Sequence, residues 1–383
     1  MKSFVFSMVL YLLFAANSYV IAEEDVDYKI EESNYTSSLV CGKCHEAIYS
    51  KWKNSMHAQS ISDPIFNLAY MQAVQESGEK AKKLCLSCHA PAVRANNDYE
   101  LNKAITNEGI MCDFCHTVKG VDLNNQDNPY IIDVGEVKRS TIRGAESPVH
   151  KVEHSELHAK SEFCAGCHEF NKDKVTIIGT YSEWKEGPYS KEGVQCQDCH
   201  MPAIKGLIVR SDIKEAKGEI NLHDLQGGHS VEQLRKAMRV RIVDTARSGD
   251  GVTVKVEITN IGSGHTVPTG LPSRELVLQM IVKDSKGRII SRDEKIYKKV
   301  LADENGNEIK KDHEFFLKGK TILSDNRIKP RETKETVFYF SYPKREELSV
   351  ETKLFYRYEP EVISTQEMFI EMGGDSRVIR YRS

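Results

Sequence analysis

The sequence predicts an α+β protein with a mostly helical or irregular N-terminal part and a C-terminal antiparallel β-sandwich of the immunoglobulin-like type. Three observations predict this division. All ten cysteines lie between residues 41 and 199 of the 383-residue chain. From about residue 239 onward the chain contains short apolar runs that alternate with polar residues. Gly, Asn, Asp and Pro separate these runs, as in turns between antiparallel strands.

The first 22 residues predict a secretory signal peptide. Lys2 gives a positive start, residues 4–16 form an apolar run, and Val20 and Ala22 suit cleavage after Ala22. The alternative is an uncleaved membrane anchor, although the apolar run is short for a bilayer span. We therefore expect a protein that is exported to the periplasm or to the outer cell surface.

One motif, Cys-x-x-Cys-His, occurs five times in the N-terminal part. Two thiols at this spacing can bond the two vinyl groups of a porphyrin, and the histidine that follows can ligate its iron. A zinc ribbon or a thioredoxin-type dithiol also uses Cys-x-x-Cys, but neither calls for the histidine. The sequence therefore predicts five covalently bound haem c groups. The predicted attachment residues are Cys41, Cys44, Cys85, Cys88, Cys112, Cys115, Cys164, Cys167, Cys196 and Cys199, and the predicted proximal iron ligands are His45, His89, His116, His168 and His200.

Composition narrows the possible functions. The chain has a formal net charge of −3 and 28% charged residues, so no basic excess supports nucleic-acid binding. The N-terminal part has about 200 residues for five haems, so it has few apolar side chains from which to build a core. We expect the porphyrins to serve as the core of this part, and therefore to lie close together.

Short helices are predicted around the motifs. Apolar residues at every fourth position predict an amphipathic helix over 46–57 that carries His57 at its end. A helix over 64–84 is predicted because Asp63 can cap it and Pro64 suits its first turn. Two further helices are predicted over 149–170 and 231–238, and Ser230 is the expected cap of the second.

The remainder of the chain is predicted to be β structure. The alternating runs predict strands over 240–243, 252–258, 275–282, 336–342 and 354–358. The predicted domains are therefore a signal peptide over 1–22, a pentahaem domain over 23–238 and a β-sandwich over 239–383.

Eight histidines lie outside the motifs and are candidates for the second axial ligands. His57 is favoured because of its place at the end of a predicted helix, while His150, His154 and His158 are spaced as on one helical face. Of these three, His150 and His158 are favoured. The remaining candidates are His223, His229, His265 and His313.

One of His223 and His229 is expected to be a ligand, because both flank two glycines that would let the backbone approach a porphyrin. His265 lies in the loop GSGHTVPTG between two predicted strands. If it is a ligand, the β-sandwich docks on the haem domain. His313 lies in a charged segment and is not expected to be a ligand.

The segment CGKCHEAIYSKWKNSMHA resembles the opening of the cytochrome c-554-like multihaem cytochromes, a group that includes relatives of hydroxylamine oxidoreductase. The family pattern places Trp, Ser and His after the motif, here Trp52, Ser55 and His57. SPVHKVEHSELHAKSEFCAGCHEF and EWKEGPYSKEGVQCQDCHMP look like later modules, and SGHTVPTGLPSRE resembles the start of a β-sandwich that some members append. The resemblance implies stacked bis-histidine haems that conduct electrons. It supports His57, His150, His158 and His265 as distal ligands.

Two departures from the wider group bear on activity. Pentahaem nitrite reductases usually bind their catalytic haem through Cys-x-x-Cys-Lys, whereas all five motifs here end in His. Relatives that oxidise hydroxylamine carry more than five motifs. The resemblance therefore implies multihaem architecture but no particular enzymatic reaction.

The leading interpretation is an exported electron carrier without catalytic residues. Its expected partners are redox proteins such as a quinol dehydrogenase or other cytochromes, and a membrane-associated partner is left open. One alternative is a reductase of nitrite, hydroxylamine or a sulfur oxyanion, with an open iron assisted by Arg94, Arg143 or His154. Another is a homo-oligomer or the subunit of an extracellular cytochrome filament.

Overall fold

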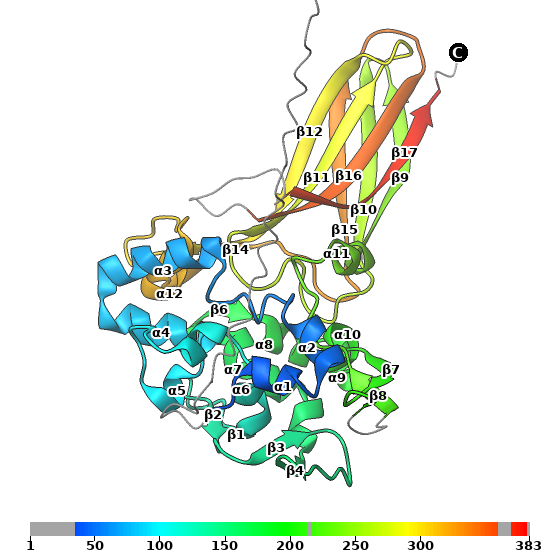
Figure 1. The fold of residues 1–383 in the computed structure, drawn as a ribbon. Coiled ribbons are helices and arrows are strands. Elements are labelled where there is room, and N and C mark those ends of the chain that lie inside the picture. Colours follow the sequence, from blue (N-terminus) through cyan, green and yellow to red (C-terminus); the bar gives the residue numbers. More distant parts are fainter. Residues whose placement is uncertain (1–34, 213–216, 359–368, 381–383) are drawn as a thin grey trace, which may run out of the picture.

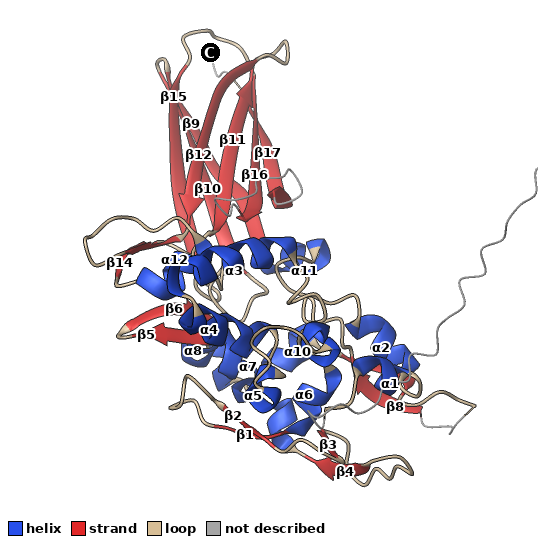
Figure 2. Ribbon diagram, turned by 60° about the vertical axis from the view of Figure 1, so that its left-hand side comes forward, coloured by secondary structure: helices blue, strands red, loops and turns tan. Residues whose placement is uncertain are grey.

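The protein was analysed as a computed structural model, which describes residues 35–212, 217–358 and 369–380. The predicted signal peptide lies outside these residues. Figures 1 and 2 show helices gathered at one end of the molecule and long strands at the other. We call residues 35–237 the N-terminal part and residues 238–379 the β domain. The predicted α+β class is confirmed.

The N-terminal part consists of short helices joined by turns and small two-stranded sheets. Its helices are α1 (Ser38–Gly42), α2 (Glu46–Trp52), α3 (Pro64–Ser77), α4 (Glu79–His89), α5 (Val93–Asn96), α6 (Cys112–Thr117), α7 (Ser161–His168), α8 (Thr180–Glu186), α9 (Pro188–Lys191), α10 (Cys196–His200) and α11 (Val231–Ala237), with 3₁₀ turns at Ala104–Glu108 and Glu156–Ala159. Its strands are β1 (Val118–Val121), β2 (Tyr130–Ile132), β3 (Val137–Ser140), β4 (Lys151–His154), β5 (Glu169–Lys172), β6 (Val175–Gly179), β7 (Ala203–Leu207) and β8 (Lys217–Asn221).

The helix predicted over 64–84 is two helices, because Gly78 adopts a φ of +52° and ends α3 before α4 begins. Its predicted start is confirmed. The carboxylate of Asp63 accepts hydrogen bonds from the backbone N–H groups of Ile65 and Phe66, with Pro64 at the first position. The cap that Ser230 provides for α11 is confirmed as well.

Two predictions about histidines on helices are wrong. Helix α2 ends at Trp52, so His57 lies in the turns that follow it. The segment predicted as helix over 149–170 begins with strand β4, which pairs in parallel with β3, and becomes α-helical only at Ser161. His150, His154 and His158 therefore do not share a helical face. Strand pairing outside the local sequence overrode the four-residue spacing.

The β domain contains two antiparallel sheets with strand orders β15-β10-β9 and β12-β11-β16-β17. Buried residues alternate along β10, from Val252 to Ile258, as the sequence predicts. The Ig-like sandwich stays a prediction, and the two sheets share one hydrophobic cluster. The elements are β9 (Met238–Ser248), β10 (Gly251–Asn260), β11 (Arg274–Lys283), β12 (Ile289–Tyr297), β13 (Lys299–Ala302), α12 (Asp312–Lys318), β14 (Thr321–Asp325), β15 (Thr333–Ser341), β16 (Leu348–Tyr358) and β17 (Phe369–Ile379).

Two long strands escaped prediction because their sequences lack the apolar alternation. β12 is an edge strand that is mostly exposed and rich in charged residues. β17 contains Gly373 and Gly374 beside a bulge of its own, where Met372 has no partner in β16. A side chain at Gly374 would lie 2.4 Å from the carbonyl oxygen of Thr352, so the backbones approach too closely for any other residue.

The apolar core is concentrated in the β domain. Its largest cluster lies entirely within residues 234–379, whereas the N-terminal part contains only small separate clusters. One further cluster joins the two parts, with Ile177 of β6 packed against Leu301 and Phe315. Helix α12 also lies beside α3 in both views. Among the described residues, no helix is long and apolar enough to cross a membrane.

Candidate haem-binding sites

Helices present the five motifs. The motifs that end at His89, His116, His168 and His200 lie in α4, α6, α7 and α10, while the first begins in α1 and ends at His45, directly before α2. Because residues three and four apart lie on the same side of a helix, one helical turn directs both thiols and the histidine toward one face. The described cysteines form no disulfide with one another.

Four motif histidines each have a second histidine ring at nearly the same distance. The ring centroids are 6.2 Å apart for His45 and His150, 6.3 Å for His168 and His57, and 6.2 Å for His200 and His265. His116 has two such neighbours, His223 at 6.4 Å and His158 at 6.0 Å. With a metal–nitrogen bond of about 2 Å and a ring centroid about 1.1 Å behind the nitrogen, two imidazoles on one metal ion have centroids about 6.2 Å apart. The residues present therefore fit iron held between two histidines.

Backbone carbonyls orient most of these rings. A ring whose Nδ1–H donates to a carbonyl keeps Nε2 as the free metal ligand and cannot rotate easily. Such Nδ1 contacts join His45 to Ile208 (2.7 Å), His89 to Ser60 (3.1 Å), His116 to Arg139 (2.6 Å), His200 to Gln226 (2.5 Å), His150 to Lys151 (3.2 Å), His223 to Asn221 (2.6 Å) and His265 to Thr266 (3.0 Å).

Two histidines lie near His116, but only one is free to ligate through Nε2. His223 uses Nδ1 on the backbone, whereas the Nε2–H of His158 donates to the carbonyl of Cys115 at 3.0 Å. The Nδ1 atom of His158 is buried without a hydrogen-bond partner. This geometry favours His223 over His158 as the ring opposite His116. His229 faces no other described histidine at such a distance.

His89 differs from the other motif histidines. All 13 histidines of the chain lie in the described residues, and none faces His89 across a gap of this kind. Instead, the ring of Phe66 stacks on the imidazole, with centroids 3.8 Å apart and planes inclined by 12°. Phe66 lies in the first turn of α3, which Asp63 caps, and Ser60 shortly before it contacts the His89 ring through its carbonyl.

Burial keeps several of these rings neutral. It lowers the pKa of His57 and of His265 to about 4, and that of His168 to about 3. All three are therefore neutral at pH 7. A neutral imidazole has the free lone pair that a metal ion requires.

The motifs are neighbours in space in an order that differs from their order in the chain. Side-chain contacts join cysteines of the first and third motifs, the second and fourth, and the fourth and fifth. The contacts are Cys41 with Cys112, Cys88 with Cys167, and Cys164 with Cys196. The fourth motif therefore lies between the second and the fifth.

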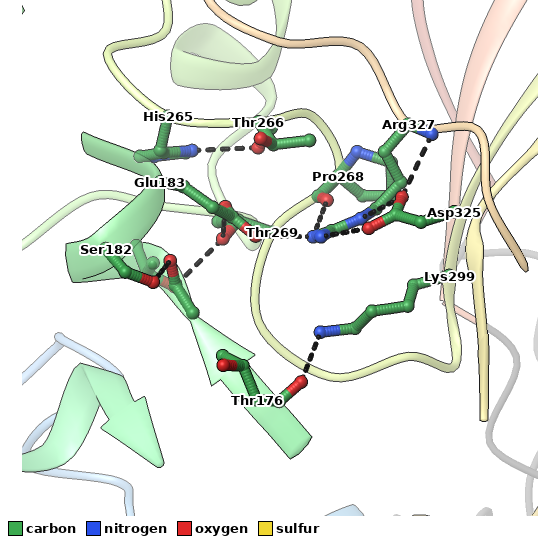
Figure 3. A network of polar contacts seen from close by, with 12 residues as sticks. Thr176, Ser182, Glu183, His265, Thr266, Pro268, Thr269, Lys299, Asp325 and Arg327 are labelled. Carbon is green, nitrogen blue, oxygen red and sulfur yellow. Dashed lines mark hydrogen bonds and ion pairs between the residues drawn. The ribbon is translucent and has the colours of Figure 1, made fainter. Parts of the chain in front are cut away.

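The β domain provides His265 from a loop that polar contacts fix. The amide of Asn260 donates to the His265 carbonyl at 3.0 Å, and the hydroxyl of Ser263 lies 3.0 Å from the imidazole Nδ1. Thr269, four residues later, donates to Glu183 of α8 at 2.7 Å (Figure 3). The loop is therefore attached to both parts of the molecule.

A buried ion-pair network continues this attachment (Figure 3). Arg327 of the β domain lies 2.7 Å from Glu183 and 2.8 Å from Asp325, and it donates to the carbonyl of Pro268 at 3.1 Å. Nearby, the Lys299 ammonium donates to the carbonyl of Ile177 in β6 at 2.7 Å. No sequence motif indicates this network, because its charged residues lie far apart in the chain.

Three of the other candidates have partners away from the motif histidines, and His154 has none for its ring nitrogens. His313 contacts Glu76 of α3 at 3.0 Å and faces no motif histidine. Arg94 donates to Asn128, and Arg143 pairs with Glu156 at the surface. His154 has both ring nitrogens buried without a hydrogen-bond partner.

Comparisons with known proteins agree with this geometry. The family model for cytochrome c554 and c-prime matches residues 40–117. A penta-heme cytochrome c552 from Thermochromatium tepidum superposes with a TM-score of 0.74 and 25% identity, covering 91% of this chain and 100% of that one. Both likenesses support a multihaem c-type cytochrome with covalently bound haem.

The remaining comparisons add nothing on function. A β-glucuronidase of Bacteroides uniformis shares 10% identity over 38% of this chain and 13% of the enzyme, with a TM-score of 0.21. That likeness is too weak to carry an argument. No curated protein matches the sequence.

The buried network should determine how firmly the two parts dock. Replacing Arg327 by Leu leaves Glu183 and Asp325 without their cation, so we expect a loss of about 3–5 kcal/mol of unfolding free energy. Urea unfolding followed by circular dichroism measures the loss. The matched control is Arg331→Leu, whose pair with Glu192 also joins the two parts but is half exposed, and should cost about 0–1 kcal/mol. Equal losses in both variants would contradict this account.

Lys299 should make stability depend on pH. Burial lowers its pKa to about 8, below the usual 10.5, so between these values the folded chain binds fewer protons than the unfolded chain. This group therefore makes the unfolding free energy rise with pH in that window. Relative to Lys299→Met, the wild-type protein should gain about 1–3 kcal/mol between pH 7.5 and pH 10. The unfolding free energy of both proteins is measured by urea titration at each pH. The same pH dependence in both would contradict a lowered pKa of Lys299.

Proposed function

We propose that this chain is an exported electron-transfer protein that holds five haem c groups. The observation that carries the proposal is the set of four histidine pairs with ring centroids 6.2–6.4 Å apart, on motifs whose cysteines contact one another. Each bound haem supplies a one-electron redox couple. The chain contributes axial ligands, burial and close spacing of the five attachment sites.

The proposed distal ligands follow from the ring pairs. We assign His150 to His45, His57 to His168, His223 to His116 and His265 to His200. In His150, His223 and His265, Nδ1 contacts a backbone carbonyl, which restrains the ring and leaves Nε2 as the ligand atom. Bis-histidine ligation of these irons would leave them no open position, which suits electron transfer without bond chemistry.

The cellular setting is also part of the proposal. Haem attachment and the predicted signal peptide favour a periplasmic or outer-surface protein that exchanges electrons with other cytochromes or a quinol dehydrogenase. We further propose a haem domain over 23–238 and an Ig-like β-sandwich over 239–383. The sandwich would complete one haem through His265.

A second candidate function is a reductase at the haem of the His89 motif. The observation that favours it is that no described histidine faces His89, while Phe66 packs on its ring. An iron without a second protein ligand there could bind a small substrate such as nitrite, hydroxylamine or a sulfur oxyanion. The other motifs lack this feature.

One experiment tests both candidates. The pyridine haemochrome assay should give five haems per chain, and EPR of the oxidised protein should give low-spin signals from at least four. A high-spin signal that azide converts to low spin would favour the reductase, because it requires an exchangeable position on the fifth iron. A wholly low-spin spectrum that azide leaves unchanged would exclude it. Fewer than four low-spin centres would contradict the assignment of four histidine pairs.

The choice between His223 and His158 can be tested by a matched pair of variants. We expect His223→Met to change the Soret spectrum and EPR signal of one haem, because the ligand opposite His116 changes. His158→Met should leave all five haem signals in place, because the Nε2 of His158 is bound to the Cys115 carbonyl. The opposite result would assign His158 as the ligand.

A further inference from the structure

We propose that Arg274 and the hydroxyl group of Tyr356 form a binding site for one carboxylate or small planar oxyanion, where the β domain meets the N-terminal part. Arg274 begins β11 and is the register partner of Tyr358, the last residue of β16. The site therefore lies at the end of the β domain that adjoins the N-terminal part (Figure 1). The electron-transfer role does not require it.

The guanidinium of Arg274 has no anionic partner among the described residues. Its Nη1 donates to the carbonyl of Thr269 at a long 3.3 Å, and its Cζ lies 5.7 Å from the ring centre of Tyr358. The described ion pairs include none to this guanidinium, although other interior arginines such as Arg139 and Arg327 each have carboxylate partners. A cation in such surroundings favours a compensating negative charge.

Two donors at this position are left unused. The Nε atom of Arg274 is buried without a hydrogen-bond partner, and so is the hydroxyl of the neighbouring Ser273. An unsatisfied buried donor destabilises the folded protein, and more so when the donor is charged. A planar anion can accept two parallel hydrogen bonds from the guanidinium fork, so it removes this cost.

At two glycines the backbone lies close against the side chains of Arg274 and Tyr356. A methyl group at Gly228 would lie 2.8 Å from the Tyr356 hydroxyl oxygen and 3.7 Å from Arg274 Nη1. One at Gly270, whose φ is +85°, would lie 2.9 Å from the same Nη1. A larger residue at either position would have to displace the Arg274 guanidinium or the Tyr356 hydroxyl.

The two carboxylates in the vicinity each have another hydrogen-bond partner, although Oδ1 of Asp312 is buried without one. Asp312 accepts a hydrogen bond of 2.7 Å from the Tyr358 hydroxyl, and Asp63 caps α3. The Arg274 charge is also a minor cause, after burial, of the lowered pKa of His168 and of His265. The cation therefore lies beside histidines of two proposed haem sites.

The anion can come from two sources that share this chemistry. A haem propionate is a carboxylate held in place by the cofactor, and this source rests on the proposed function. A free solute anion such as acetate or nitrate is the other. A propionate at the site would exclude an added anion, so the two sources differ in whether acetate or nitrate binds. Removing a nearby cation also disfavours the reduced state of a haem, which has one more negative charge.

The test compares Arg274→Gln with Arg292→Gln, an exposed arginine of β12, in holoprotein whose haem content is first shown to be unchanged. Tyr356→Phe serves as a milder second variant should Arg274→Gln fail to fold. Spectroelectrochemical titration measures the midpoint potentials. Calorimetric titration at constant ionic strength measures binding of acetate and nitrate.

Each outcome decides the proposal. If a propionate is the ligand, one midpoint potential falls in the Arg274 variant and stays unchanged in the Arg292 variant, without heat of acetate or nitrate binding. If a free anion is the ligand, the wild-type protein binds acetate or nitrate and the Arg274 variant binds at least tenfold more weakly. Unchanged potentials together with no anion binding in the wild-type protein would overturn the site, while five intact haems would leave the electron-transfer proposal standing.

Discussion

The fixed separation between paired imidazoles is the constraint on which the N-terminal part depends. The four proposed pairs have ring centroids 6.2–6.4 Å apart, and a metal ion shared by two imidazoles would require the backbone to hold this separation closely. The short helices direct the motif histidines, and backbone carbonyls hold most of the facing rings. The small hydrophobic clusters between the motifs are too few to provide this rigidity alone.

The pairing of His265 with His200 also depends on how the β domain docks on the N-terminal part. His265 comes from a loop more than sixty residues beyond its proposed partner His200, so its ring stays in place only if the two parts stay docked. The Arg327 network, Lys299 and the cluster around Ile177 provide that docking. Their burial makes the junction specific, because each charge would be costly without its partner across the interface.

Two residues that lack the expected partner, His89 and Arg274, bear most directly on function. His89 has an aromatic ring beside it instead of a facing imidazole, and Arg274 has a buried donor without an acceptor. A small ligand that binds at such a position removes the free energy cost of the unsatisfied group, and this contributes to its affinity.

The sequence by itself determined the attachment chemistry, the α+β division and five of the long strands, because each rests on local spacing or on alternation along the chain. It also pointed to His57, His150 and His265. Only the tertiary structure decided which ring faces which. Four-residue spacing put His158 and His150 on one helix, but pairing of β4 with β3 removed that helix, and the Cys115 carbonyl engaged His158. His223, the unpaired His89 and the Arg327 network depend on contacts between distant segments, which no local pattern encodes.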